Sequence, residues 1–377
     1  MIYLDNSATS HPKPPQTMRY MVDFVTNVGG NPGRSGHTAS VEAARIIFRA
    51  REKLASLIKA PDSERIIFTQ NGTDSLNLAI LGILGEADHV ITTSMEHNSV
   101  MRPLTYLQNT RKVQVSIADC APHGELDPER IKGLIKKNTK AVIINHGSNV
   151  TGGLQDLRGI RAATEGLFLI VDACQTIGSF PIDVVGDRID ALCFSCHKSL
   201  YGVQGLGAVY LREGVTPIPL RFGGTGSRSE SIEQPTILPD CYESGTPNTP
   251  GIASLLGGLT FIEETGIGKI MEKEGALMKA LRAGLEDTGQ TTIYGAQGSA
   301  PPIPVLSFNI KGKLPSEVGY ELNKRGIYVR VGLHCSPEAH RTIGTFPHGA
   351  VRVSPGYFTG ESDIAAFIEA VREIAET

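Results

Sequence analysis

The stretches FLIVDACQT (168–176) and DALCFSCHKSLYGVQGLGAVYL (190–211) decide the fold of this chain. Both contain a short apolar run, Phe168–Asp172 and Ala191–Ser195, and each run leads directly into polar residues. Apolar runs of five residues without polar alternation are typical of strands that are buried on both faces, as in a parallel sheet. The sequence therefore predicts neighbouring parallel strands with a polar site at their carboxyl ends, where α/β sheets bind ligands.

The same pattern extends outward along the chain. Further strands are predicted at 66–69, 89–93, 113–118, 141–146 and 207–211, and amphipathic helices at 40–59, 73–84 and 128–137. This alternation predicts an α/β fold with a mostly parallel central sheet and helices on both faces. An irregular stretch rich in Gly, Ser, Thr and Pro follows at 217–251, which suggests disorder, a lid or an oligomer contact. Helices at 252–264, 268–286, 315–325 and 361–376, with strands at 305–310, 327–331 and 350–354, predict a smaller α+β C-terminal domain.

The composition excludes several classes of protein. The chain has 377 residues, of which 40% are hydrophobic and 20% charged, and a formal net charge of −3. This charge gives no support for a nucleic-acid or anionic-membrane partner, and no apolar run is long enough to span a bilayer. The N-terminus lacks the pattern of a signal peptide, so a cytoplasmic location is expected. Six cysteines are too few for a disulfide scaffold in a chain of this size, and the Cys193–Cys196 spacing has no second pair that would complete a zinc site.

Lys198 and Asp172 are the residues whose positions are hardest to attribute to packing. Lys198 follows a buried strand and precedes a glycine-rich run, although a surface lysine is the ordinary expectation. Asp172 ends the adjacent strand, where it would alternatively cap a helix. A desolvated amine that forms a Schiff base and an anion that holds a protonated ring nitrogen are the two requirements of pyridoxal phosphate (PLP) chemistry.

Three other strand ends carry polar residues with two readings each. Gly72 and Thr73 follow the strand at 66–69 and open a helix, so they predict a phosphate seat, or simple N-capping by Thr73. His97 is either a hydrogen-bonded histidine or an imidazole that stacks on a planar ring and moves protons. Asn149 either shapes the turn before Gly152 or donates to a ligand oxygen.

The segment near the C-terminus adds two arginines and a cysteine. Arg330 and Arg352 lie at strand-like positions, where they would either bind a carboxylate or pair with a structural acid. Cys335 leaves a strand into a loop with basic neighbours, which is typical of a reactive thiolate and less so of a buried, inert thiol.

Taken together, these segments resemble the cysteine desulfurase and selenocysteine lyase family of class V aminotransferases, which are PLP enzymes of fold type I. The resemblance covers almost the whole chain. It is carried by nine motifs in the order of the family: YLDNSAT from Tyr3, FTQNGTDSLNLAI, EHNSV, SNVTGG, VDACQT, SCHKSLYG, ESGTPNT, RVGLHC and VRVS.

The resemblance implies a role for each residue around the cofactor ring. Lys198 would form the Schiff base with PLP and later move the Cα proton. Asp172 would keep the pyridine nitrogen protonated, and His97 would stack on the ring. Gln175 and Asn149 would contact the phenolic oxygen or the substrate.

The resemblance also implies a phosphate site and a homodimer. Gly72, Thr73, Ser195 and His197 would bind the phosphate within one chain. Thr246 would reach the phosphate of the neighbouring subunit, so that the irregular stretch would build the dimer.

For the reaction, the resemblance implies removal of sulfur from L-cysteine. Arg352, with Arg330, would hold the amino-acid carboxylate. Cys335 would attack the substrate sulfur, which leaves L-alanine and a protein persulfide for transfer to an acceptor. The short spacing between Cys335 and Arg352 resembles the subgroup with an ordered catalytic loop, which suggests dependence on a docking acceptor protein.

Alternatives stay open at this point. L-selenocysteine lyase chemistry would use the same residues, whereas an aminotransferase or β-lyase, or a non-catalytic scaffold, would leave Cys335 without a role. Cys174 and Cys196 depart from the family pattern and suggest either packing or a preference for selenium. The N-terminal extension common in the short-loop subgroup is also missing.

The expected organisation is an N-terminal segment at 1–14 packing with the small domain, a large PLP-binding domain at 15–260 and a small domain with the catalytic-cysteine loop at 261–377.

Overall fold

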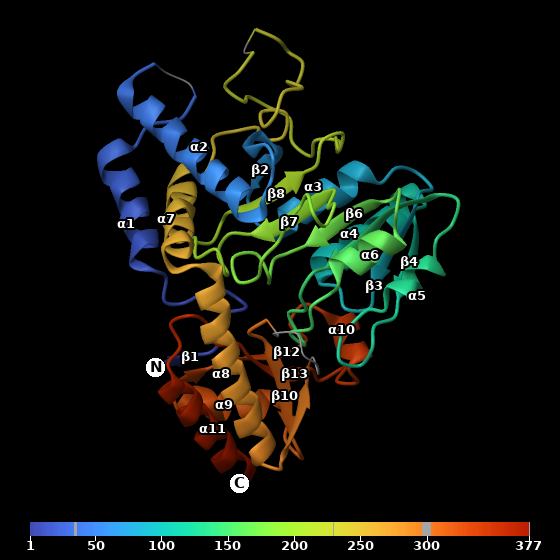
Figure 1. Ribbon diagram of the computed structural model, residues 1–377, viewed down its shortest axis with the longest axis vertical. Helices are drawn as coiled ribbons and strands as arrows, with labels where there is room; N and C mark the ends of the chain where they lie inside the picture. The colour runs from blue at the N-terminus through green and yellow to red at the C-terminus, as the bar shows by residue number, and fades with distance from the viewer. Residues whose placement is uncertain (34–35, 229, 296–302, 377) are drawn as a thin grey trace.

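The computed structural model describes residues 1–33, 36–228, 230–295 and 303–376, and its centre is a seven-stranded mixed sheet (Figure 1). Only β8 runs antiparallel to its neighbours β2 and β7, and the remaining strand pairs are parallel. In spatial order the strands are β2 (Ile66–Thr69), β8 (Gly207–Leu211), β7 (Ala191–Ser195), β6 (Phe168–Asp172), β5 (Thr139–Asn145), β3 (His89–Thr93) and β4 (Gln114–Ala118). The expected α/β fold with a mostly parallel sheet is confirmed.

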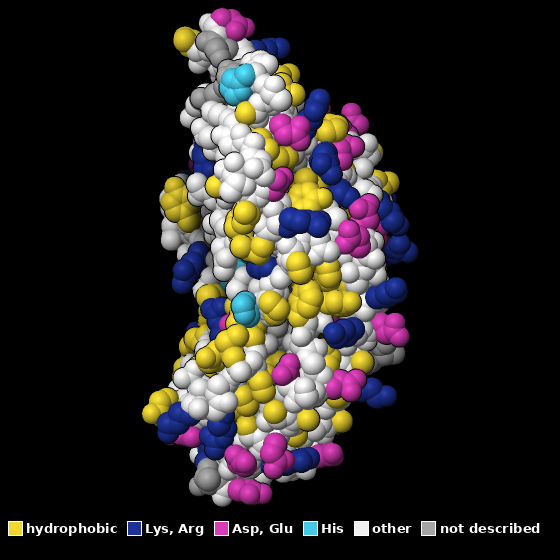
Figure 2. Space-filling view, turned by 90° about the vertical axis from the view of Figure 1, so that its left-hand side faces the viewer, with side chains coloured by type: hydrophobic (Ala, Val, Ile, Leu, Met, Phe, Trp, Pro, Cys, Tyr) yellow, Lys and Arg dark blue, Asp and Glu magenta, His cyan; other side chains and the backbone are white. Residues whose placement is uncertain are grey.

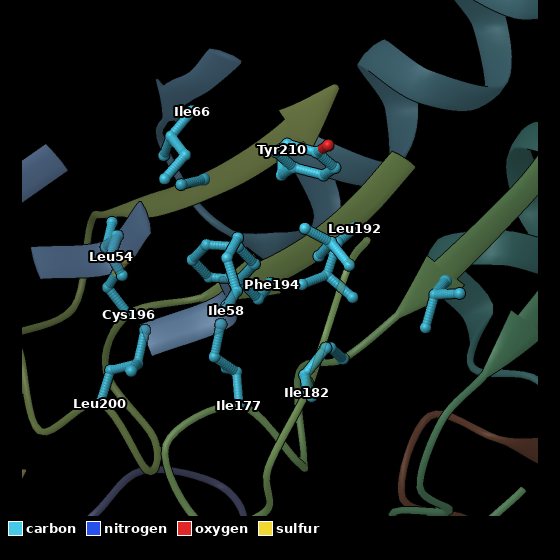
Figure 3. Close-up of a cluster of buried hydrophobic side chains, with 14 of the residues drawn as sticks. Leu54, Ile58, Ile66, Ile177, Ile182, Leu192, Phe194, Cys196, Leu200 and Tyr210 are labelled. Atoms are coloured by element: carbon cyan, nitrogen blue, oxygen red, sulfur yellow. The ribbon is translucent and has the colours of Figure 1, made fainter. Parts of the chain in front are cut away.

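Helices cover both faces of this sheet because its strands are apolar on both sides. On β7, Leu192 and Phe194 face one core, whereas Ala191 and Cys193 face the other. Figure 3 shows the first core, in which Leu192 and Phe194 lie near Leu54 and Ile58 of the long helix α2. The large-domain helices are α1 (Pro15–Asp23), α2 (Thr38–Ile58), α3 (Gly72–Ile83), α4 (Asn98–Arg111), α5 (Pro128–Lys132), α6 (Leu157–Ala163) and α7 (Thr249–Thr265).

Most predicted elements are present. The single strand predicted at 327–331 is wrong, because Ile327–Tyr328 and Arg330–Gly332 are two short strands in different sheets, and two further differences have local causes. The strands at 66–69, 89–93, 168–172, 191–195 and 207–211 have the predicted bounds. The helix predicted at 128–137 is wrong in length, because it ends at Lys132 before Gly133, a residue poorly suited to a helix interior. Helix α4 was not predicted because it contains Pro103, which normally ends a helix.

The second, smaller domain is built around a four-stranded antiparallel sheet. Its strand order is β12 (Arg330–Gly332), β13 (Ala350–Val353), β10 (Leu306–Ile310) and β9 (Thr291–Tyr294). Helices α8 (Ile267–Asp287), α9 (Pro315–Lys324) and α11 (Glu361–Glu376) cover it, and α10 (Pro337–Thr342) follows the cysteine loop. The first strand β1 (Ile2–Tyr3) pairs in parallel with β11 (Ile327–Tyr328), so the start of the chain lies on this domain. The proposed domain bounds stay a prediction.

The segment between β8 and α7, residues 212–248, contains no helix or strand in its described part. It is nevertheless anchored to the large domain by Glu243, which pairs with the buried Arg51 at 2.8 Å. The same carboxylate accepts the N–H of Phe68 in β2 at 2.6 Å. No helix in the described part of the chain is both long and apolar enough to cross a membrane.

The strands that carry the site are held by a buried carboxylate at the edge of the sheet opposite the site. Asp190, at 2% exposure, precedes β7 and accepts the N–H of Leu169 in β6 at 2.7 Å. It also pairs with Arg161 of α6 at 3.0 Å and with Arg212 after β8 at 2.6 Å. One side chain therefore sets the relative position of the start of β7, the start of β6 and the end of β8, at the edge of the sheet opposite the polar residues.

We expect Asp190→Ala to lower the free energy of unfolding by about 3–5 kcal/mol, because it leaves the buried Arg161 guanidinium without its counter-charge. Glu42→Ala, which breaks the exposed Arg45–Glu42 pair at 3.3 Å, should change the same quantity by less than about 0.5 kcal/mol. Urea unfolding of both variants measures the difference. A loss below about 1 kcal/mol for Asp190→Ala would show that this cluster does not hold the strands.

Candidate active site

A cavity of about 230 Å³ lies at the carboxyl ends of β5, β6 and β7, with the small domain on its other side. Every residue predicted for the site lines this cavity except Thr246. The predicted residues brought together are Gly72, Thr73, His97, Asn149, Asp172, Gln175, Ser195, His197, Lys198, Arg330, Cys335 and Arg352. They come from seven separate segments, which only the folded chain unites.

The amine of Lys198 projects into this cavity from the turn after β7. Desolvation lowers its pKa below that of a free lysine, an effect that Cys174 and Asp172 oppose and that Arg352 reinforces. Asp172 is buried, and its Oδ1 accepts the N–H of Cys174 at 2.9 Å. The carboxylate is thus held across its own turn rather than capping a helix. The site combines a lysine biased toward its neutral, nucleophilic form with a fixed anion.

The start of α3 offers an anion-binding surface. Asn71, rather than Thr73, caps this helix, since its Oδ1 accepts the N–H of Asp74 at 2.9 Å. The hydroxyl of Thr73 instead contacts Ser99 Oγ at 2.8 Å. A side chain at Gly72 would place its Cβ 2.5 Å from the sulfur of Cys174, so only glycine fits here.

Two buried polar atoms beside this helix start have no partner in the described part of the chain. They are Ser195 Oγ and His197 Nδ1, both at the end of β7. Buried polar groups are normally hydrogen-bonded, so an orphaned pair next to a helix N-terminus indicates a bound group with anionic oxygens. The arrangement fits a phosphate.

His97 is the N-cap of α4, and its Nδ1 accepts the N–H of Ser99 at 3.1 Å. Its remaining proton in the neutral ring therefore lies on Nε2. Desolvation lowers the pKa of His97 to about 4, in spite of the opposing charge of Asp172. The imidazole is neutral at physiological pH, so it stacks or exchanges protons without adding a charge to the cavity.

Arg330 and Arg352 are opposite one another on the antiparallel strands β12 and β13. Arg352 is 1% exposed, and its Nη2 donates to Asp5 Oδ1 at 2.6 Å. Its Nε is buried and has no hydrogen-bond partner among the described residues. Arg330 has no carboxylate partner among the described residues, and an unpaired guanidinium beside the unpartnered Nε of Arg352 fits recognition of a further carboxylate. The predicted pairing of Arg352 with a structural acid is present, and Asp5 is a partner that the sequence patterns did not identify; binding of a substrate carboxylate stays a prediction.

Cys335 lies in a strained loop between β12 and α10. Both His334 and Cys335 adopt left-handed backbone, with φ of 50° and 60°. This conformation costs a non-glycine residue on the order of 1–3 kcal/mol. Cys335 is exposed, and Arg330 Nη2 lies 3.7 Å from its sulfur, where the cation would stabilise negative charge on it. The thiol also borders an open groove of about 550 Å³ between α3 and α4.

Two predicted ligand contacts also hold the protein together. Gln175 Nε2 donates to the carbonyl of Ser7 at 3.1 Å. Asn149 Nδ2 donates to the carbonyl of His334 at 2.8 Å. Thr246 is exposed in the irregular segment, outside the cavity. Cys196 is fully buried in the core shown in Figure 3, so this thiol serves packing, one of the two explanations considered for it. Cys174, in contrast, lines the cavity.

The N-terminal segment supports the lysine turn through contacts that sequence patterns did not reveal. The carbonyl of His197 accepts from Thr9 Oγ1 at 3.0 Å and from Lys13 Nζ at 2.6 Å. Ser10 Oγ donates to the carbonyl of Lys198 at 2.8 Å. The only sequence signal for this support was the YLDNSAT motif, which says nothing about which atoms it contacts.

Glu96, next to His97, is an acid that the patterns left without a role. It is fully buried, and its Oε1 accepts from Thr93 Oγ1 at 2.6 Å and from the N–H of Asn145 at 3.0 Å. Its Oε2 has no partner in the described part of the chain. Burial raises the pKa of Glu96 from 4.5 to about 8, so the side chain is uncharged at neutral pH.

Because the folded-state pKa of Glu96 is raised, its contribution to stability is complete below the unfolded-state pKa and is lost as the pH rises toward 8. We expect Glu96→Gln to remove this loss. The stability of the variant relative to the wild type should rise by on the order of 2–3 kcal/mol between pH 4.5 and pH 7. Urea unfolding across this range measures the change, and the exposed Glu369→Gln serves as a matched control. If the free energy of unfolding depends on pH in the same way in the wild type and in Glu96→Gln, then Glu96 is not protonated in the folded protein at neutral pH.

Comparison with known proteins places this site in a family. Residues 2–367 match the family model described as Aminotransferase class-V. A probable cysteine desulfurase of Pyrococcus abyssi is 30% identical over 100% of this chain and 95% of its own length. A cysteine desulfurase of Wigglesworthia glossinidia brevipalpis is 29% identical over 99% of this chain and 92% of its own length.

Solved structures agree with this assignment. The apo structure of a cysteine desulfurase from Thermococcus onnurineus NA1 has a TM-score of 0.93 at 30% identity, and covers 100% of this chain and 94% of its own. The cysteine desulfurase CsdA from Escherichia coli has a TM-score of 0.90 at 26% identity, and covers 99% of this chain and 94% of its own. The family model, the relatives and the shared fold lead to one conclusion: this chain belongs to the class V aminotransferase family, among relatives named cysteine desulfurases.

Proposed function

We propose that this chain is a PLP-dependent cysteine desulfurase, which converts L-cysteine to L-alanine and leaves the sulfur as a persulfide on Cys335. The observation that carries the proposal is the single cavity that holds a desolvated lysine, a fixed carboxylate, two arginines and an exposed cysteine. The names of the relatives favour the same reaction.

The residues present fit PLP. Ser195 Oγ and His197 Nδ1 are buried and without partners beside the start of α3, as a phosphate would require. Asp172 would face the ring nitrogen, and Lys198 would form the Schiff base. When bound, PLP supplies an aldehyde carbon for that linkage and a pyridine ring that accepts electrons from the substrate.

The substrate is oriented by its carboxylate. Arg352 has a buried, unpartnered Nε, and Arg330 lies opposite on the neighbouring strand. A carboxylate bound there would place the Cα–H of the amino acid toward Lys198. The Lys198 amine then accepts the Cα proton, for which its lowered pKa keeps a larger share of the amine neutral.

Cys335 performs the sulfur transfer. Its thiolate attacks the substrate sulfur, so that an S–S bond forms as the Cβ–S bond breaks. The electron pair of the broken bond stays with the substrate carbon, and protonation of that carbon, together with return of the Cα proton from Lys198, gives alanine. The guanidinium of Arg330 lies 3.7 Å from the Cys335 sulfur, beside the reacting atom.

An acceptor would reach the Cys335 persulfide through the groove between α3 and α4. Cys335 borders both the enclosed cavity and the open groove between α3 and α4, which is lined by Leu81, Arg102 and Tyr106. A protein or small-molecule thiol entering the groove would reach the persulfide without displacing the cofactor. Selenocysteine lyase activity has no comparable support, because Cys196, one of the two thiols that suggested it, is part of the hydrophobic core.

The proposal includes a homodimer in which Thr246 contacts the phosphate of the neighbouring subunit. Thr246 is exposed and lies outside its own cavity. Figure 2 shows hydrophobic side chains in patches on the face that carries α1. Exposed apolar residues of α1, α2 and the irregular segment include Val22, Phe48, Ile218, Phe222 and Ile232.

The six free thiols agree with a reducing, cytosolic location.

We expect the purified protein to be yellow with PLP and to release alanine from L-cysteine. Lys198→Ala should abolish the absorbance of the Schiff base and lower alanine release by at least about 100-fold. Cys335→Ala should retain the absorbance of the Schiff base but form no persulfide, and its turnover of cysteine should fall by at least about 100-fold. Absorbance spectra, alanine assays and mass spectrometry of the Cys335 peptide measure these results.

Cys241→Ala, at a buried thiol distant from the cavity lining, serves as the matched control and should keep wild-type turnover. A colourless wild type that binds no PLP would overturn the whole proposal. Loss of cysteine turnover with retained selenocysteine turnover in Cys335→Ala would favour the lyase instead.

The dimer makes a separate prediction. Light scattering should give twice the 40.4 kDa mass of one chain. Thr246→Ala should keep that mass but weaken PLP binding about tenfold, because it removes a hydrogen bond to a charged phosphate. A monomer that binds PLP as tightly as any dimeric preparation would contradict the shared site.

A further inference from the structure

Ser336, the residue after Cys335, has an unusual hydrogen bond. It stands at the N-cap of α10, where a serine hydroxyl ordinarily accepts a backbone N–H of the helix. Here the side chain makes no capping bond. Ser336 is fully buried, and its Oγ donates to Oδ1 of Asn149 at 2.9 Å. The hydroxyl therefore serves a contact with the large domain in place of its local one.

That contact fixes the orientation of the Asn149 amide. With Oδ1 held by Ser336, the nitrogen side faces the carbonyl of His334, to which Nδ2 donates at 2.8 Å. One side chain thus bonds to the residues on both sides of Cys335. The backbone carbonyl of Asn149 also accepts from Arg352 Nη1 at 3.2 Å, so the same residue touches the arginine proposed to bind substrate.

The loop needs this support because its backbone is strained. Left-handed conformations at two consecutive non-glycine residues, His334 and Cys335, relax unless the surroundings hold them. The carbonyl of Cys335 has its own bond, from the N–H of Asn98 at 2.8 Å. Three successive residues of a small-domain loop are therefore each bonded to the large domain, and only the bond of Ser336 is made by a side chain of the loop.

We infer that Ser336 is a positioning residue for Cys335: through Asn149 it holds the strained loop so that the thiol stands at the mouth of the cavity. This inference rests on the proposed function, in which Cys335 receives the sulfur. Ser336 touches neither substrate nor cofactor in this role. Its removal impairs the sulfur-transfer step and leaves the binding of cysteine largely intact.

The test is Ser336→Ala in the PLP-loaded enzyme, compared with Ser254→Ala. Ser254 is an equally buried serine of α7 whose Oγ donates to the carbonyl of Gly251 at 2.6 Å and accepts the N–H of Val203 at 3.0 Å, outside the cavity lining. For Ser336→Ala we expect kcat to fall about five- to tenfold with KM within about twofold, as loss of one hydrogen bond predicts. Amide hydrogen exchange in the loop 333–343 should be about fivefold faster, with or without PLP. Ser254→Ala should match the wild type in kcat and in loop exchange.

Wild-type kcat and loop exchange in Ser336→Ala would overturn the inference. A rise in KM equal to the fall in kcat would also overturn it, since Ser336 would then act on substrate binding. The proposed function fails by a different result, which is full cysteine turnover in Cys335→Ala. The two failures are therefore distinguished by the two variants.

Discussion

The buried ion pair between Asp5 and Arg352 joins the parts of the chain on which the site depends. Arg352 lies at the centre of the small-domain sheet, and a buried guanidinium without a counter-charge would cost several kcal/mol. Asp5 supplies that charge from the N-terminal segment, just after β1 joins the small domain. The same segment then continues to the large domain, where Thr9 and Ser10 bond to the carbonyls of the lysine turn. The position of Lys198 relative to Arg352 is thus set by a few residues at the start of the chain.

Desolvation controls the charges of groups that line the active-site cavity or lie next to it. It lowers the pKa of Lys198, lowers that of His97 to about 4 and raises that of Glu96 to about 8. The histidine and the glutamate are therefore neutral at physiological pH. A dry site with few charges makes each of them stronger, because the low dielectric does not screen them as water does.

The cysteine loop shows how strain and hydrogen bonding are balanced. Two left-handed residues cost roughly 2–6 kcal/mol together, and the three bonds from Asn98, Asn149 and Ser336 each contribute about 0.5–1.5 kcal/mol. These sums are similar, so the loop is held without a large surplus. Under the proposed function, such a balance would keep the Cys335 thiol ordered at the cavity mouth and still let it meet an acceptor from the groove.

The sequence by itself determined the sheet, the class of chemistry and most of the residues that line the cavity. Runs such as 168–172 and 191–195 are apolar on both faces, so they could only be central strands, and parallel strands bring their carboxyl ends to one edge. Local patterns also located Lys198 and Cys335. They failed at α4, where Pro103 obscured the helix, and at Gly133, which shortened α5.

Only the tertiary structure decided which groups pair with which. Asp5 and Arg352 are 347 residues apart, and Asn149 and Ser336 are 187 apart, so no local pattern could connect them. The neutral state of Glu96 and the orphaned atoms of Ser195 and His197 depend on burial, which is a property of the folded chain. Sequence periodicity reports the faces of single elements, whereas contacts between distant segments and the loss of water around them arise only when those faces pack together.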